Sequence, residues 1–486
     1  MSLNSVLEIG KSGLNIYQMA TEVTSQNIAN VNTPGYSRQQ VVLETAPPTT
    51  ANGFPLGTGV RIASITRSYD ALLQQQLVNA QTTQGYDTTK STVLQQIEPS
   101  FNEVANDGLG AAISNFFGAW QDLTINPAGT SERQAVLTRA QILVDTFHSI
   151  STTLNNTIAT QDTSLGPLSA DITAKLQNIA QLNGQIKTTQ MVSGNANELK
   201  DQRDQLIRDL STEVGITYKE QSDGTVDVKL AGDPTKALVT GNQYATMYAD
   251  NAGGTTLNDI YLTAVGNPPP AQAPATDAQI TATVGGPNNS LGEIGATLAL
   301  RNTIIPGYLG QVNALASTIA STVNTQQLAG SDLNGSTPPP GGPPTTIAFF
   351  DPATTNAADI AINPALTSSN QIAAAANGAP TGDNTNAVAV ANLQHAFTMS
   401  GNTTTFNSYY DSMVSTLGLD VQSSKNTVAQ DAAFTQQLTT LQQSNSGVSL
   451  DEELTNLVKY QRSYQASAKL VTTATDMMDT VLGLIR

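Results

Sequence analysis

The stretch Asn456-Leu457-Val458-Lys459-Tyr460-Gln461-Arg462-Ser463-Tyr464-Gln465-Ala466-Ser467-Ala468-Lys469 belongs to a run that is nearly free of helix breakers. From Val448 to Arg486 there is no proline, and the only glycine is Gly483. The spacing of apolar residues, at steps of three and four, predicts one long helix with a nearly heptad seam, suited to lie along a second helix. The seam residues are Leu450, Leu454, Leu457, Tyr464, Val471, Ala474, Met478, Val481 and Ile485.

The first thirty residues supply a partner for this helix. They carry a looser apolar stripe, with Gly10 and Gly13 as weak points for helix formation. Pro34 disfavours helix at Thr33, and Pro34-Gly35 fits the two central positions of a type II turn. The stripe consists of Leu3, Val6, Leu7, Leu14, Met19, Val23 and Ile28. From the pattern alone, an ordinary pair of terminal helices on a globular core fits equally well.

Two motifs at opposite ends of the chain carry a family resemblance. The segment Ser25-Gln26-Asn27-Ile28-Ala29-Asn30-Val31-Asn32-Thr33-Pro34-Gly35-Tyr36-Ser37-Arg38-Gln39 resembles the N-terminal signature of bacterial flagellar rod, hook and hook-associated proteins. The stretch from Asn456 to Lys469 is similar to the closing motif of the same superfamily. The form of the turn, with Ser-Arg-Gln after Tyr36, and the helical segment Trp120 to Phe147 look most like the hook-associated members at the hook–filament junction.

This resemblance implies an extracellular structural subunit of the flagellum, exported by the flagellar secretion apparatus without a cleaved signal peptide. The implied partners are further copies in an axial ring, the hook protein, the next hook-associated protein leading to flagellin, and an export chaperone. We expect the assembly interface to include Leu14, Val23, Asn27, Ile28, Asn30, Pro34, Gly35, Tyr36, Leu454, Leu457, Tyr464, Val471 and Met478.

Two other functions stay open. A hook or distal-rod axial protein shares both end motifs, although the Trp120 to Phe147 segment argues against it. A secreted adhesin or binding module, acting through a β insert, is the alternative from a different class.

The composition argues against several classes of partner. Only 12% of the 486 residues are charged, and the net charge is −17. No cluster of Lys and Arg is present to neutralise nucleic-acid phosphates or acidic lipid headgroups. No window approaches 18 consecutive apolar residues, so we expect no membrane insertion.

The sequence predicts no catalytic, cofactor or metal site. Cysteine is absent, which excludes thiolate zinc sites and a cysteine nucleophile. His148 and His395 lie in no zinc-peptidase motif, and neither a Gly-x-Ser-x-Gly elbow nor a phosphate-binding loop occurs. A catalytic triad assembled in space stays open as an alternative. One predicted helix carries a charge-rich patch, and its alternating positive and negative charges predict solvated ion pairs. The patch consists of Lys200, Asp201, Arg203, Asp204, Arg208 and Asp209.

The predicted fold is multidomain α+β: long terminal α-helices forming a coiled pair, an α-helical body and an inserted all-β domain. Within the body, helices are predicted over 135–159 and 165–214, bent at Gly194, and strand-like pieces continue through 280–284. The segments are an N-terminal axial helix and extended arm (1–68), helical body (69–214), β domain (215–288), body continued (289–333), a β/loop excursion (334–385), body (386–446) and a C-terminal axial helix (447–486).

The expected mechanism couples folding of the two ends to assembly. A lone subunit offers the end helices little to bury against, and ordering costs about 1–2 kcal/mol of backbone entropy per residue. We therefore expect the ends to become ordered only when both seams pack against neighbouring subunits.

Overall fold

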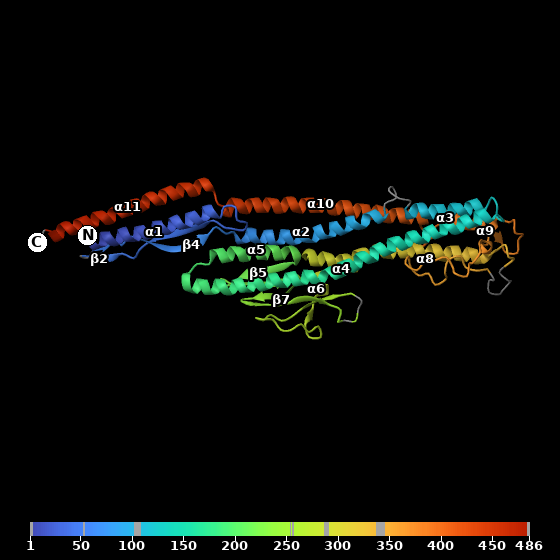
Figure 1. Cartoon of the computed structure of the whole chain (residues 1–486), viewed down its shortest axis with the longest axis horizontal. Helices are drawn as coiled ribbons and strands as arrows, with labels where there is room; N and C mark the ends of the chain where they lie inside the picture. Colours follow the sequence, from blue (N-terminus) through green and yellow to red (C-terminus); the bar gives the residue numbers. More distant parts are fainter. Residues whose placement is uncertain are drawn as a thin grey trace.

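The computed structural model describes residues 3–51, 54–101, 108–252, 254, 257–285, 291–336 and 346–483. The molecule is elongated, with most helices along its long axis, and both ends of the chain lie together at one tip (Figure 1). Three predicted features lie wholly or partly outside the described residues: the seam residue Ile485, the domain boundary at residue 288, and residues 337–345 of the β/loop excursion.

The two terminal helices, α1 (Leu3–Ala29) and α11 (Leu450–Gly483), run side by side in opposite directions (Figure 1). Gly10 meets Val471, and a Cβ added at Gly10 would lie 2.7 Å from Val471 Cγ2. A Cβ at Gly13 would lie 2.7 Å from Ser467 Oγ. The glycines that look like weak points in the sequence are thus what lets α11 approach α1 closely.

An extended arm follows α1 and folds back along it. Strand β1 (Gln39–Thr45) pairs antiparallel with β4 (Val60–Arg67), with a register shift between Val42 and Leu43. The short strands β2 (Thr49–Ala51) and β3 (Phe54–Leu56) pair beyond them. Gly59, at φ +104°, brings the arm against Ser12 of α1.

The helical body has its main core at the tip farthest from the chain ends. Trp120 is fully buried there in an aromatic cluster with Phe116, Phe117, Phe349 and Phe406. The elements around this core are α3 (Leu109–Leu123), α8 (Ile305–Ala329), α9 (Thr385–Asn392), the paired strands β12 (Gly330–Ser331) and β13 (Ala375–Ala376), and the ends of α2 (Ala71–Ile97), α4 (Thr130–Ser193) and α10 (Phe406–Ser446).

Helix α4 differs from the prediction, which left a break between residues 159 and 165. It is one continuous helix of 64 residues that passes through Pro167. Leu165, Ile172 and Ile179 form one buried stripe across the proline, and their packing offsets the local cost of the hydrogen bond that Pro167 cannot donate. The predicted bend at Gly194 is present, with φ +70°, and α5 (Asn197–Glu213) then runs back along α4.

Two small sheets lie on the side of α4 and α5 that faces away from α10 (Figure 1). One contains β5 (Ile216–Glu220), β6 (Val226–Leu230), β7 (Asp233–Thr240) and β8 (Gln243–Tyr244); the other contains β9 (Met247–Asp250), β10 (Asp259–Leu262) and β11 (Ala278–Gln279).

The strand predicted over 280–284 is wrong, because the short helix α6 (Thr281–Gly285) occupies that position. Ile280 and Val284, both buried, are four residues apart, a spacing that suits a helix as well as a strand. Helix α7 (Gly292–Ala299) and a π-helical turn (Leu300–Ile304) then lead into α8. The chain is therefore mostly helical with several small sheets.

Gly85 on α2 tests how tightly the body helices pack. A Cβ at this position would overlap the backbone carbonyl of Thr212 on α5, which cannot move aside as a side chain can. Gly85→Ala should destabilise the body by about 2 kcal/mol, measured by urea denaturation. Gly310→Ala on α8 is the matched control, since nothing lies within 4 Å of the added Cβ. Equal stability of the two variants would contradict this packing.

Candidate functional site

The predicted signature turn after α1 is present. The Tyr36 amide donates to the Thr33 carbonyl oxygen at 3.2 Å, and Gly35 has φ +78° at the third position. The turn directs the residues after it back towards α1 and α5. An open groove of about 670 Å³ lies between the turn and the α4–α5 hairpin, and the side-chain amides of Asn30, Gln181, Gln185, Gln202 and Gln205 are among the groups that line it.

Asn27 is the centre of a joint that we define as the contacts among residues 27–39, Arg67, α5 and the start of α11. Its side chain is fully buried and makes four hydrogen bonds. Nδ2 donates to the Gln39 carbonyl at 2.9 Å and to Glu453 Oε2 at 3.1 Å. Oδ1 accepts from the Gln39 amide at 3.0 Å and from the Tyr36 hydroxyl at 2.8 Å. One amide group thus connects α1, β1 and α11.

The Tyr36 hydroxyl keeps the proton that it donates to Asn27. Burial, with the nearby charges of Glu198 and Asp201, raises the pKa of Tyr36 to about 12. The hydrogen bond therefore persists throughout the neutral pH range.

Glu453 links the N-terminal motif to the C-terminal helix. Its carboxylate is buried and accepts from Arg38 Nε at 2.7 Å as well as from Asn27. The same guanidinium reaches Glu452 at 2.7 Å. Burial alone would lower the pKa of Arg38, but the hydrogen bonds to both carboxylates outweigh it and raise that pKa. The ends of the chain are thereby joined by a charge-assisted contact.

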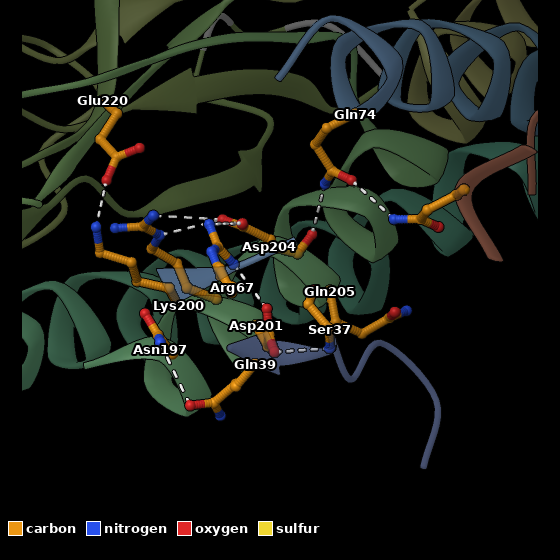
Figure 2. A network of polar contacts seen from close by, with 12 residues as sticks. Ser37, Gln39, Arg67, Gln74, Asn197, Lys200, Asp201, Asp204, Gln205 and Glu220 are labelled. Atoms are coloured by element: carbon orange, nitrogen blue, oxygen red, sulfur yellow. Dashed lines mark hydrogen bonds and ion pairs between the residues drawn. The ribbon is translucent and has the colours of Figure 1, made fainter. Parts of the chain in front are cut away.

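The joint is fixed to the body through Arg67 at the end of β4 (Figure 2). Its guanidinium donates to Asp201 and to Asp204 of α5, each at 2.7 Å, and lies 4.2 Å from the centre of the Tyr69 ring. The Ser37 amide donates to the second Asp201 oxygen at 2.8 Å. Although burial would lower the pKa of Arg67, Asp204 and Asp201 raise it, so the guanidinium stays charged.

The prediction that the α5 charges form solvated ion pairs is wrong for four of the six residues. Asp201, Arg203, Asp204 and Arg208 are buried, while Asp209 is exposed and Lys200 pairs with Glu220 near the surface. Arg203 donates to the Gly224 carbonyl at 2.7 Å, and Arg208 donates to Gln74 at 2.6 Å. The main cation for Asp201 comes from β4, 134 residues earlier, which the pattern of a single helix cannot show.

The residues expected in the assembly interface occupy three environments. Val23 and Asn27 are buried. The half-buried residues are Leu14, Ile28, Asn30, Gly35, Tyr36, Leu457, Val471 and Met478. Pro34, Leu454 and Tyr464 are exposed. At the start of α11, Glu453 faces α1 and is buried, whereas Leu454 is exposed. Burial of the Glu453 carboxylate is possible because Asn27 and Arg38 donate hydrogen bonds to it.

Exposed apolar side chains cover both flanks of the contact between α11 and α1. Leu454 and Val458 lie on one flank, and Leu470 and Met477 on the other, with 49–54% of each residue's surface exposed. The residues of α11 that are buried are Glu453, Ser467 and Ala474. The fully buried side chains of α11 are thus small or polar. Val471, which meets Gly10, and Tyr460, which stacks on Tyr17, are half-buried, and other large apolar side chains are left at the surface.

Sequence reasoning missed Arg67, Asp201, Asp204, Arg38 and Glu453 as parts of one site. Arg38 lies inside the quoted motif, and its charge beside a predicted helix pair was a usable signal. The others have no such signal, because they meet only in the folded chain.

In the described residues, no group of three His, Asp or Glu side chains could hold a metal. Among the same residues, no helix has the length and hydropathy needed to cross a membrane.

Residues 94–341 match the family described as the flagellar hook-associated protein FlgK helical domain. The chain belongs to this FlgK family. Residues 7–36 match the flagella basal body rod protein family, and residues 442–484 match the C-terminal family of the flagellar basal body rod FlgEFG proteins. These two segments contain most of the two end motifs, so the resemblance seen in the sequence is confirmed.

Relatives of this FlgK-family chain match it over nearly its whole length. Flagellar hook-associated protein 1 of Bacillus subtilis is 29% identical over 511 residues, covering 98% of this chain and 97% of the relative. Proteins of the same name from Salmonella typhimurium and Escherichia coli are 28% and 26% identical, each covering 99% of this chain and 100% of the relative. The flagellar hook junction protein FlgK from Burkholderia pseudomallei shares the fold, with a TM-score of 0.64, 19% identity, and coverage of 76% of this chain and 100% of that chain.

Arg67→Met tests the joint of this FlgK-family chain. The variant leaves Asp201 and Asp204 buried without their cation, which should cost on the order of 3–5 kcal/mol. Hydrogen exchange of the β4 amides in the folded chain measures the loss. Arg61→Met is the control: its pair with Glu44 is exposed (59% and 42%), so the cost should stay below about 1 kcal/mol. Equal effects of the two substitutions would refute the buried joint.

Proposed function

We propose that the chain is a structural, non-enzymatic subunit of the bacterial flagellum that forms the junction between hook and filament. Relatives named flagellar hook-associated protein 1 match it almost end to end, which supports this assignment. The observation that carries the mechanism is the contact of Asn27 and Arg38 with Glu453. It joins the N-terminal motif to the C-terminal helix, several of whose large apolar side chains remain at the surface.

The terminal helices would act as a coiled pair that assembles with neighbouring copies. Full burial of one exposed Leu or Val contributes about 1.5–3 kcal/mol. Ordering one residue costs about 1–2 kcal/mol in backbone entropy. No large apolar side chain of α11 (Leu450–Gly483) is fully buried in the single chain, so the exposed flanks must find neighbours before the balance favours order. Ordering of the pair and polymerisation would then be one coupled process.

The other segments would serve this assembly from the outside. The sheets β5–β8 and β9–β11 lie on the side of α4 and α5 away from α10 (Figure 1), which supports a β domain (215–288) that would project away from the axis in an assembled ring. The proposed partners are further copies of the chain, the hook protein, the next hook-associated protein leading to flagellin, and an export chaperone. The site of action would be the extracellular flagellum, reached through the flagellar secretion apparatus.

Deletion of the gene distinguishes this function from the nearest alternative. Loss of a junction protein should leave hooks without filaments in electron micrographs. Loss of a hook or distal-rod protein should leave no hooks, and that outcome would contradict the proposal.

Substitution of the exposed flanks tests the mechanism. The combined variant Leu454→Ser, Val458→Ser and Leu470→Ser should keep the far-UV circular dichroism of the monomer but yield hooks that carry no filaments. The reason is that these side chains are exposed in the single chain and would be buried only between copies. The control Met191→Ser with Val192→Ser removes two exposed apolar side chains (73% and 85%) near the end of α4, away from the terminal helices, and should swim normally. Normal swimming of the α11 variant would count against the proposed interface.

A further inference from the structure

The contact between α2 and the second half of α10 is unusually polar. The two helices run antiparallel: Gln442 Nε2 lies 3.4 Å from Gln74 Oε1 near one end, and Lys425 Nζ lies 4.0 Å from Glu98 near the other. The buried apolar cluster of this contact consists of Leu73, Leu77, Ala80 and Leu438. Four such side chains hold a long helix weakly, so polar groups in the same contact have a large influence on it.

Asp87 of α2 and Asp431 of α10 face each other in the middle of this contact. The antiparallel register between the Gln74–Gln442 and Glu98–Lys425 contacts sets residue 87 opposite residue 431, and a hydrogen bond between the two carboxyl groups is among the causes that raise the pKa of Asp87. Asp431 Oδ2 is buried, and no N–H or hydroxyl donor of the described residues reaches it. Two further oxygens, Gln81 Oε1 and Thr435 Oγ1, are buried without a partner in the neighbouring turn. A buried carboxylate oxygen without a donor is costly unless the opposing carboxyl group supplies a proton.

We propose that Asp87 and Asp431 form a carboxyl pair that shares one proton and sets how tightly residues 426–446, and α11 behind them, are held on α2. With the proton present, Asp87 donates O–H to the Asp431 carboxylate and the two helices are joined. Without it, two negative charges face each other across the contact and weaken it. This device belongs to the single chain and goes beyond the proposed function.

The direction of the pH dependence follows from the environment of Asp87. Burial, then the charge of Asp431 and the hydrogen bond to it, raises the pKa of Asp87 to about 6, while Lys90 opposes the shift. An unfolded Asp has a pKa near 4. The folded contact therefore gains stability as the pH falls through about 6, and loses it as the pH rises through the same value.

Among the charges of α2 and its neighbouring helices, only Asp431 and Lys90 act on Asp87. Glu98 is next to Lys425, and Tyr86 adjoins Asp87 on α2 itself. Helix α5 packs on the opposite side of α2, where Gly85 meets Thr212. The charges of α5 and α7, Glu213 and Glu293 included, are not among the groups that act on Asp87. Asp431 and Lys90 are thus the charges that decide its protonation.

Hydrogen exchange of residues 426–446 in the full chain tests the proposal. After correction for the intrinsic exchange rate, protection in the wild-type chain should fall about tenfold between pH 5.0 and pH 7.5. Asp431→Asn should remove this difference and give high protection at both pH values. Asp411→Asn is the control, since it removes an exposed carboxylate from the same helix and should keep the wild-type pH dependence.

Several outcomes would overturn the proposal. Equal wild-type protection at the two pH values would do so, and so would an unchanged pH dependence in Asp431→Asn. Loss of folding or of protection in Asp431→Asn would also contradict it, because neutralising the pair must strengthen the contact. Asp87→Asn is expected to behave as Asp431→Asn does, and a difference between them would show that no proton is shared.

Discussion

The buried carboxylate of Glu453, held by Asn27 and Arg38, is the interaction on which the rest of the molecule depends. A buried carboxylate without partners would be expensive, so residues 27–39 must fold as they do before α11 can begin where it does. Asn27 also binds both backbone groups of Gln39, which places the extended arm. Arg67 at the end of that arm then binds Asp201 and Asp204 and fixes the whole joint to α5.

Beyond the joint, the two terminal helices touch where Gly10 meets Val471, where Gly13 meets Ser467, and where the rings of Tyr17 and Tyr460 stack. Gly10 and Gly13 bring α11 close, but close approach of small residues buries little apolar surface. Several larger side chains of α11, Leu454, Val458, Leu470 and Met477 among them, flank the contact and remain exposed. The pair is therefore anchored firmly at its base and weakly along its length, which is the arrangement expected of a surface completed by neighbouring copies.

Much of the secondary structure could be predicted from the sequence because it depends on local rules. The end helices, the Pro34-Gly35 turn and the buried Trp120 follow from periodicity and turn chemistry. The break predicted after residue 159 was wrong because tertiary packing overrides the Pro167 penalty. The strand predicted over 280–284 was wrong because a five-residue segment carries too little pattern to separate strand from helix.

The joint could not be predicted in the same way. Whether Asp201 is solvated or buried depends on Arg67, which belongs to a distant strand. Glu453 looks like a favourable charge in the first turn of a helix, and only its contact with Asn27 shows that it faces inwards. Gly10 and Gly13 count against a helix by propensity, yet they are required by the helix that lies against them.

The central claim is that the outer parts of the terminal helices become ordered only among neighbouring copies. Hydrogen exchange of the dilute, monomeric chain measures this directly. The account predicts that residues 3–20 and 460–483 exchange at nearly the rate of an unfolded chain, while α2 and α4 remain strongly protected. Protection of both ends equal to that of α2 and α4 in the lone chain would contradict it.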